Sequence, residues 1–285
     1  MPYAHSGDVR LYYETRGRDS DPAVLLIEGL SVQLLGWRPE LIDRFVARGL
    51  RPVLFDNRDV GLSSKLGGPD ATGACYTLWD MARDVLAVAD DLGLDTFHVA
   101  GQSLGGMIAQ VLLAEAGDRV RSVTLFYTAP AFRAEYLRDP DQKQEGFEFC
   151  QDADSAVEGS VARERVSSSP GYPFDEDWAR DLARRSYERC YEPAGNLRQM
   201  AAVESFHDGV LAQIQGCPVP ATITHGSADA YFLPRAAIDL YQALPQAELH
   251  LFPGMGHELV EPLWDAYADS LARTVARGTA VADKR

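Results

Sequence analysis

The segment at residues 97–106 constrains the fold of this chain more than any other. It runs from a short apolar strand through a Gly-x-Ser-x-Gly motif, centred on Ser103, into a helical start rich in small residues. This is the pattern of a nucleophile elbow, in which a sharp turn leaves the serine hydroxyl accessible. Gly101 and Gly105 lack a Cβ atom, so strand and helix can approach closely. Because the motif also matches unrelated loops, the rest of the chain has to supply the context.

The elbow also predicts half of an oxyanion site. Leu104 would offer its backbone N–H at the start of the helix, where unpaired donors and the helix dipole favour an anion. The second N–H should come from the loop after an earlier buried strand, here Glu28-Gly29-Leu30. We therefore nominate the N–H of Leu30, with Gly29 beside the substrate. An ionised Glu28 would oppose the oxyanion, so we expect it either to point away into a hydrogen-bond network or to have a pKa raised by burial.

The periodicity of the chain predicts its fold class. An alternating edge strand is expected at residues 9–15, and helical periodicities separate the later strands. Buried strands are expected in the apolar runs at residues 23–27 and 52–55, and further strands at residues 96–100, 120–127, 219–224 and 248–252. This alternation predicts an α/β fold with a mostly parallel central sheet and helices on both faces. Chemistry in such sheets is found at the carboxyl ends of the strands.

The pattern changes over residues 130–216, where charge is dense and no buried strand is evident. We expect this stretch to be an inserted helical cap, or lid, on a core domain formed by residues 1–129 and 217–285. Aromatic residues that could face a pocket there are Phe132, Tyr136, Phe147, Phe149, Tyr172, Phe174, Trp178, Tyr187, Tyr191 and Phe206. Of these, Trp178 and Phe206 are our candidates for substrate contact.

A serine nucleophile needs a base, and the base needs a third group that fixes its tautomer. Asp229 follows the strand expected at residues 219–224, and His257 lies on a glycine-flanked loop after the next strand. Both positions fall at the same edge of the predicted sheet as Ser103. The chain order Ser, Asp, His is that of α/β-hydrolases. We therefore predict a catalytic triad of Ser103, Asp229 and His257.

Other titratable residues receive structural interpretations. Glu258 and Glu261 are expected to face solvent or to cap the last helix, and Arg58 and Asp59 to hold the loop after Asp56 by ion pairing. The remaining histidines, expected to be structural or exposed, are His5, His98, His207, His225 and His250.

Four motifs together resemble the α/β-hydrolase superfamily over nearly the whole chain: the elbow, the loop Asp-Asn-Arg-Asp-Val-Gly-Leu-Ser at 56–63, and the segments ending in Asp229 and His257. The segment at 27–37 and the Asn-Arg-Asp form of the loop are similar to anthracycline (aclacinomycin-type) methyl esterases. That resemblance implies attack of Ser103 on an ester carbonyl, an acyl-enzyme, and release by water that His257 activates. It also implies a bulky polycyclic methyl ester held under the cap.

Several functions share this machinery. The same triad could serve a lactonase, a C–C bond hydrolase, a perhydrolase or an acyltransferase. A ligand-binding protein that kept the fold and lost catalysis is the alternative from another class. Ser103 argues against epoxide hydrolases and dehalogenases, which use an aspartate nucleophile.

Composition limits the partners. With 27 basic and 42 acidic residues, the formal net charge of −15 disfavours nucleic acids and anionic membranes. No apolar run approaches the ~20 residues of a membrane span, and no stretch of signal-peptide type begins the chain, so a cytoplasmic location is expected. The four cysteines form no C-x-x-C pair, which disfavours zinc and disulfides. We expect a small-molecule substrate, no metal or cofactor, and a monomer or homodimer.

Overall fold

A mixed sheet forms the centre of the protein, for which a computed structural model describes residues 3–68, 70–73, 75–141, 150 and 152–282. Its strands follow the order β1-β2-β4-β3-β5-β6-β7-β8. Their bounds are β1 (Tyr3–Ser6), β2 (Val9–Thr15), β3 (Ala23–Ile27), β4 (Arg51–Phe55), β5 (Phe97–Gln102), β6 (Val120–Phe126), β7 (Ala221–Gly226) and β8 (Ala247–Phe252). Strand β1 pairs antiparallel with β2, and β2 pairs antiparallel with β4. Every further neighbouring pair along this order, from β4 through β3 to β8, is parallel. The predicted mostly parallel sheet is confirmed.

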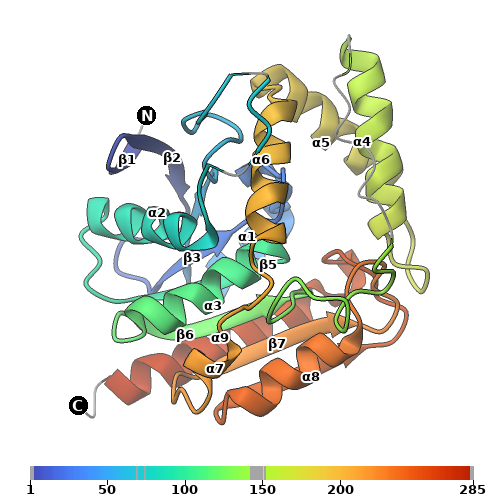
Figure 1. Ribbon diagram of the computed structural model, residues 1–285. Helices are drawn as coiled ribbons and strands as arrows, with labels where there is room; N and C mark the ends of the chain where they lie inside the picture. The colour runs from blue at the N-terminus through green and yellow to red at the C-terminus, as the bar shows by residue number, and fades with distance from the viewer. Residues whose placement is uncertain (1–2, 69, 74, 142–149, 151, 283–285) are drawn as a thin grey trace.

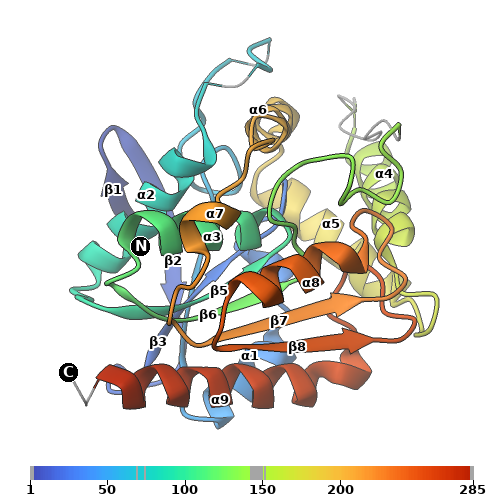
Figure 2. The ribbon, with the colours of Figure 1, turned by 60° about the horizontal axis from the view of Figure 1, so that its bottom comes forward.

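Helices cover both faces of the sheet, as Figure 2 shows. One face carries α1 (Pro39–Ala47) and α9 (Trp264–Ala282), and the other carries α2 (Leu78–Asp91), α3 (Leu104–Ala116) and α8 (Pro234–Ala243). Successive side chains of a strand point to opposite faces. In β3, Leu25 accordingly joins the core under α2 and α3, while Leu26 joins the core under α1 and α9. Such burial on both faces explains why β3 is a continuous apolar run.

Within residues 130–216, the described part contains helices and one isolated bridge, between Leu137 and Phe232. The helices are α4 (Ala153–Ser167), α5 (Glu176–Arg189), α6 (Pro193–Glu204) and α7 (Leu211–Ile214). Figure 1 shows α4, α5 and α6 standing together, apart from α7, which contacts α3 and α8. Valines of α4 and alanines of α5 form a small core of their own. The cap boundaries at 130 and 216 stay a prediction.

The loop after β4 is held by ion pairs of Arg58 and Asp59, as expected from the sequence. Arg58 pairs with Asp84 of α2, with both N···O distances 2.6 Å. Asp59 pairs with Arg198 of α6 at 2.8 and 2.9 Å. Each residue therefore ties the loop to a different helix, because its partner comes from elsewhere in the chain. In the part of the chain that the structure describes, no helix has the length and apolar character needed to cross a membrane.

Candidate active site

Ser103 lies in a strained turn between β5 and α3. Its φ of +51° lies in a region that residues with a Cβ rarely adopt. The turn is tight, because a Cβ on Gly101 would come within 2.2 Å of the carbonyl oxygen of Gly105. The Ser103 N–H donates to Phe126 O at 3.0 Å, and Thr128 Oγ1 donates to Ser103 O at 2.7 Å. The close approach of the two backbone segments at Gly101 explains why glycines flank the serine.

The structure brings Ser103, His257 and Asp229 together. His257 Nε2 lies 2.8 Å from Ser103 Oγ, and His257 Nδ1 lies 2.8 Å from Asp229 Oδ2. The other oxygen of the fully buried Asp229 accepts the N–H groups of Tyr231 at 2.8 Å and Phe232 at 2.9 Å. Burial opposes the charge of Asp229, but His257 and these donors keep its pKa below the ordinary value. An ionised Asp229 can therefore orient the imidazole and stabilise its cation.

Glycine-rich loops deliver the acid and the base. Asp229 follows β7, where a Cβ on Gly226 would lie 2.1 Å from Met255 O. His257 follows β8, and its N–H donates to Ser167 O, at the end of α4, at 2.8 Å. A helix of the predicted cap therefore holds the backbone of the candidate base.

Aromatic rings enclose the imidazole of His257. The ring centroids of Tyr127, Tyr231 and Phe232 lie 4.6, 4.9 and 5.7 Å from that of His257. A low-polarity surround strengthens the hydrogen bonds of His257 and limits access of water to it.

The two candidate oxyanion donors both lie beside Ser103. Leu104 is the first residue of α3, so its N–H has no carbonyl one turn earlier in the helix. Leu30 follows β3, and a Cβ on its neighbour Gly29 would lie 3.5 Å from Ser103 Cβ. Gly29, Leu30 and Leu104 line the same cavity as Ser103. Their role toward an oxyanion stays a prediction.

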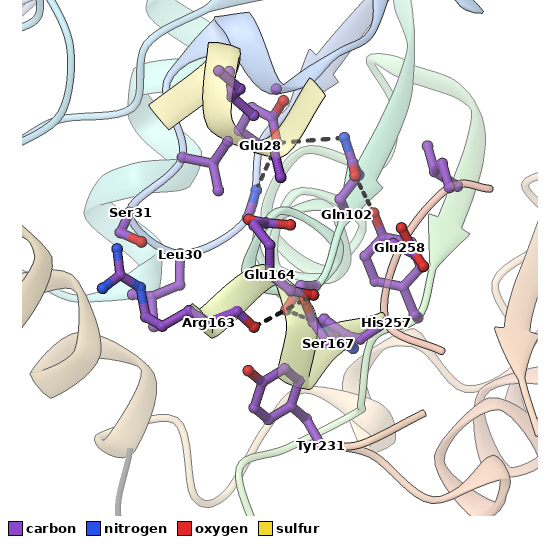
Figure 3. A pocket seen from close by; sticks show the side chains of 18 of the residues that line it. Glu28, Leu30, Ser31, Gln102, Arg163, Glu164, Ser167, Tyr231, His257 and Glu258 are labelled. Atoms are coloured by element: carbon purple, nitrogen blue, oxygen red, sulfur yellow. Dashed lines mark hydrogen bonds between the residues drawn. The ribbon is translucent and has the colours of Figure 1, made fainter. Parts of the chain in front are cut away.

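Ser103 lines a cavity of about 870 Å³. Figure 3 shows this cavity with Leu30, Glu164 and His257 among its labelled wall residues. Trp178, Phe174 and Phe132 line it, in agreement with their expected position. The guanidinium of Arg38 lies 4.4 Å from the ring centroid of Trp178 and so fixes this ring in place. The cavity wall thus combines aromatic rings with charged side chains, Glu164 and Glu258 among them.

Phe206, the other candidate for substrate contact, lies elsewhere. It is 1% exposed and packs edge-on against Trp79 of α2, with a centroid distance of 5.7 Å. Its side chain attaches the end of α6 to the core. Tyr136, Tyr172, Tyr187 and Tyr191 also lie outside the cavity wall, and Phe147 and Phe149 fall outside the described residues.

Glu28 takes part in a hydrogen-bond network and also has a pKa raised by burial, the two alternatives that the sequence left open. Its side chain is buried, and its Oε2 accepts hydrogen bonds from Gly29 N–H at 3.2 Å and from Gln102 Nε2 at 3.3 Å (Figure 3). Gln102 in turn accepts a hydrogen bond from Tyr127, whose ring packs on His257. Burial raises the pKa of Glu28 to about 8, so the carboxyl is largely neutral near pH 7.

Glu28→Gln is expected to stabilise the fold increasingly as the pH rises. Unfolded Glu28 ionises near its ordinary pKa of 4.5, whereas folded Glu28 ionises near 8, so the native state binds the extra proton between these values. The free energy of unfolding of the wild type therefore falls with pH in this window, by up to about 1.4 kcal/mol per unit. The difference from Glu28→Gln should reach a few kcal/mol at pH 8–9 in urea titrations. A difference that is the same at pH 5 and pH 8.5 would contradict a neutral Glu28.

Several cavity residues were not predicted as such. Glu258 does not face solvent: its Oε1 accepts the N–H of Ser169 at 2.7 Å, and burial raises its pKa. Glu164 of α4 also lines the cavity, and burial together with Glu258 raises its pKa. His225 lies buried behind the acid, with its Nε2 3.7 Å from Asp229 Oδ2. For Glu164, no sequence motif predicts a place in the cavity wall, because that place depends on how α4 packs against the rest of the protein.

Among the residues that the structure describes, no three His, Cys, Asp or Glu side chains are grouped so that they could hold a metal ion.

Known proteins resemble this chain in sequence and in fold. RutD of Azorhizobium caulinodans, named as a candidate carbamate hydrolase, is 38% identical over 125 residues, which span 44% of this chain and only 43% of that relative. Rhodomycin D methylesterase DnrP of Streptomyces peucetius is 26% identical over 88% of this chain and 90% of its own length. The enol-lactonase of Burkholderia xenovorans LB400 has the same fold, with a TM-score of 0.72 at 22% identity over 96% of this chain and 100% of that chain. The family model of the alpha/beta hydrolase fold matches residues 22–262, and the chain therefore belongs to this family of hydrolases.

Proposed function

We propose that this protein is a serine esterase that cleaves a carboxylic ester through an acyl-enzyme. The observation that carries the proposal is the continuous hydrogen-bonded series from Ser103 Oγ through His257 to Asp229, with 2.8 Å at both links. A serine alcohol becomes a useful nucleophile only when such a base accepts its proton. A ligand-binding protein has no chemical need for this arrangement.

In the proposed reaction, Ser103 Oγ attacks the ester carbonyl while His257 Nε2 takes the hydroxyl proton. The tetrahedral oxyanion accepts hydrogen bonds from the N–H groups of Leu30 and Leu104. His257 then gives its proton to the departing alcohol, which leaves an acyl-serine. A water molecule repeats the sequence: His257 removes its proton, the acid departs, and Ser103 regains its hydrogen. Asp229 stays ionised and stabilises the imidazolium in both halves.

The cavity supports a bulky substrate. Its volume of about 870 Å³ and the aromatic side chains of Phe132, Phe174 and Trp178 suit a fused-ring acyl group, with the scissile ester directed at Ser103. The similarity to the rhodomycin D methylesterase and the sequence at 27–37 favour a methyl ester of a polycyclic metabolite.

Labelling with a fluorophosphonate tests the proposed chemistry. The wild type is expected to gain one phosphonyl group on Ser103, measured by intact mass and peptide mapping, because the reagent reacts only with an activated serine. His257→Ala should lose this labelling. The matched control is His207→Ala, because His207 is exposed and has only a 3.4 Å contact with Asp208. No adduct on the wild type, under conditions that label a known esterase, would favour the ligand-binding alternative.

The substrate class is tested separately. Methyl esters of anthracene- or tetracene-type carboxylic acids should give a higher kcat/KM than methyl butyrate, which has the same leaving group, since their rings can contact the aromatic side chains of the cavity. Equal or lower values for all fused-ring esters would argue for a different acyl group.

A further inference from the structure

The turn that carries the candidate donor Leu30 is not stable by itself. It spans residues 29–32 and is closed by a long hydrogen bond, 3.4 Å, from Val32 N–H to Gly29 O. Within it, Ser31 has a φ of +65°, a left-handed conformation that is unfavourable for a residue with a Cβ. Such a conformation persists only when surrounding groups hold it.

Gln199 of α6 stabilises this turn. Its Oε1 accepts the N–H of Ser31 at 2.8 Å, and its Nε2 donates to the carbonyl of Arg58 at 2.8 Å. Because both ends of the amide have a partner, the side chain has one defined orientation. The residue is 0% exposed, so water does not compete for these hydrogen bonds. Gln199 thus connects the turn after β3 to the loop after β4.

Helix α6 packs closely against the loop after β4 near Gln199. The preceding residue, Arg198, forms the two-pronged ion pair with Asp59. One turn earlier, a Cβ on Gly195 would lie 2.3 Å from Asp59 O, so helix and loop are in close backbone contact. The position of Gln199 is therefore set by the docking of the helix and not by its own flexibility.

A second connection ties the same loop to α5. Gln33, which is 5% exposed, donates its Nε2 to Ser186 O at 2.8 Å and to Cys190 O at 3.0 Å. Side-chain hydrogen bonds thus join the loop at 29–33 to α6 through Gln199 and to the end of α5 through Gln33. Of these, the bond from Gln199 reaches Ser31, the residue that follows Leu30.

We infer that Gln199 is a positioning residue that directs the N–H of Leu30 toward the oxyanion formed on attack by Ser103. This inference rests on the proposed esterase function. Gln199 does not line the cavity, whereas its neighbours Met200 and Val203 do, so it acts through the turn and not on the substrate. The effect belongs to the transition state, in which the carbonyl oxygen becomes an anion, and little of it to ground-state binding.

Gln199→Leu provides the test, because leucine has a similar volume and removes both hydrogen bonds. We expect kcat for ester hydrolysis to fall by about 10- to 100-fold with KM changed by less than about twofold, since a misplaced donor costs transition-state stabilisation. Active-site titration with a fluorophosphonate gives kcat per functional site, so that loss of folded protein is not counted as loss of rate. Asn196→Leu, one turn earlier on α6, is the matched control and should keep the wild-type kcat.

Hydrogen exchange supplies a readout independent of turnover. The Ser31 amide should exchange slowly in the wild type and in Asn196→Leu, and faster in Gln199→Leu. If Gln199→Leu does not fold, Gln199→Asn replaces it, because the shorter amide cannot span Ser31 and Arg58. A wild-type kcat per titrated site in the variant that folds would overturn the inference. Absence of both labelling and ester turnover in the wild type would instead overturn the proposed function.

Discussion

Ser103→Ala is expected to lower kcat for ester hydrolysis by on the order of 10⁴- to 10⁶-fold, because the variant has no oxygen that can form the acyl-enzyme. Stopped-flow measurements with p-nitrophenyl butyrate should also lose the initial burst that reports acylation. Ser168→Ala is a suitable control and should leave kcat unchanged, since Ser168 is partly exposed and its Oγ donates to Arg165 O, three residues earlier, at 2.7 Å.

The double variant Ser103→Ala/His257→Ala sharpens this result. If serine and histidine act as one unit, as the 2.8 Å contact between them suggests, removing the base from a protein without the nucleophile costs nothing more. The double variant should therefore be about as slow as Ser103→Ala alone. Multiplicative losses would mean that His257 acts on the reaction by a route that does not involve Ser103.

Arg198→Met is expected to lower the free energy of unfolding by about 3–5 kcal/mol, as is typical when one partner of a buried ion pair is removed. Arg198 and Asp59 are both 0% exposed, and methionine would leave the Asp59 carboxylate buried without its cation. Arg198 also donates to Ala71 O at 2.7 Å, so a second segment loses its attachment. Urea denaturation at pH 7 measures the change.

An ion pair with both side chains exposed serves as the control for Arg198. Arg184 contacts Asp154 at 3.0 Å, with 49% and 85% of the two side chains exposed. Arg184→Met should leave the urea midpoint nearly unchanged, because exposed pairs are screened by solvent. Equal effects of the two substitutions would contradict the structural importance of the Arg198 pair.

Local patterns were sufficient to predict every strand of the sheet except β1, and the catalytic candidates. A parallel strand buried on both faces, such as β3, is apolar throughout and is therefore visible in the sequence. Asp229 and His257 each follow a parallel strand, and glycines mark the tight turns around them. Because the carboxyl ends of parallel strands meet at one edge, chain order alone brought both residues to Ser103.

The contributions of residues 130–216 could not be predicted in the same way. Arg198 and Gln199 are polar, and a hydrophobicity pattern assigns them to the solvent side of a helix, yet both are fully buried. Their partners, Asp59 and Ser31, lie far away in the sequence, and only the docking of α6 brings them together. Aromatic identity was equally uninformative, since Phe206 packs in the core while Trp178 lines the cavity.

The hydrogen bonds of Gln199 have a consequence for how such an enzyme can change over evolution. A lid that only covered the substrate could be exchanged or reshaped freely to accept new molecules. Here the same helix places Met200 and Val203 in the cavity wall and Gln199 against the turn beside the nucleophile. With the role proposed for Gln199, a change of α6 that admits a new substrate would also change the rate of turnover, so the two properties would evolve together.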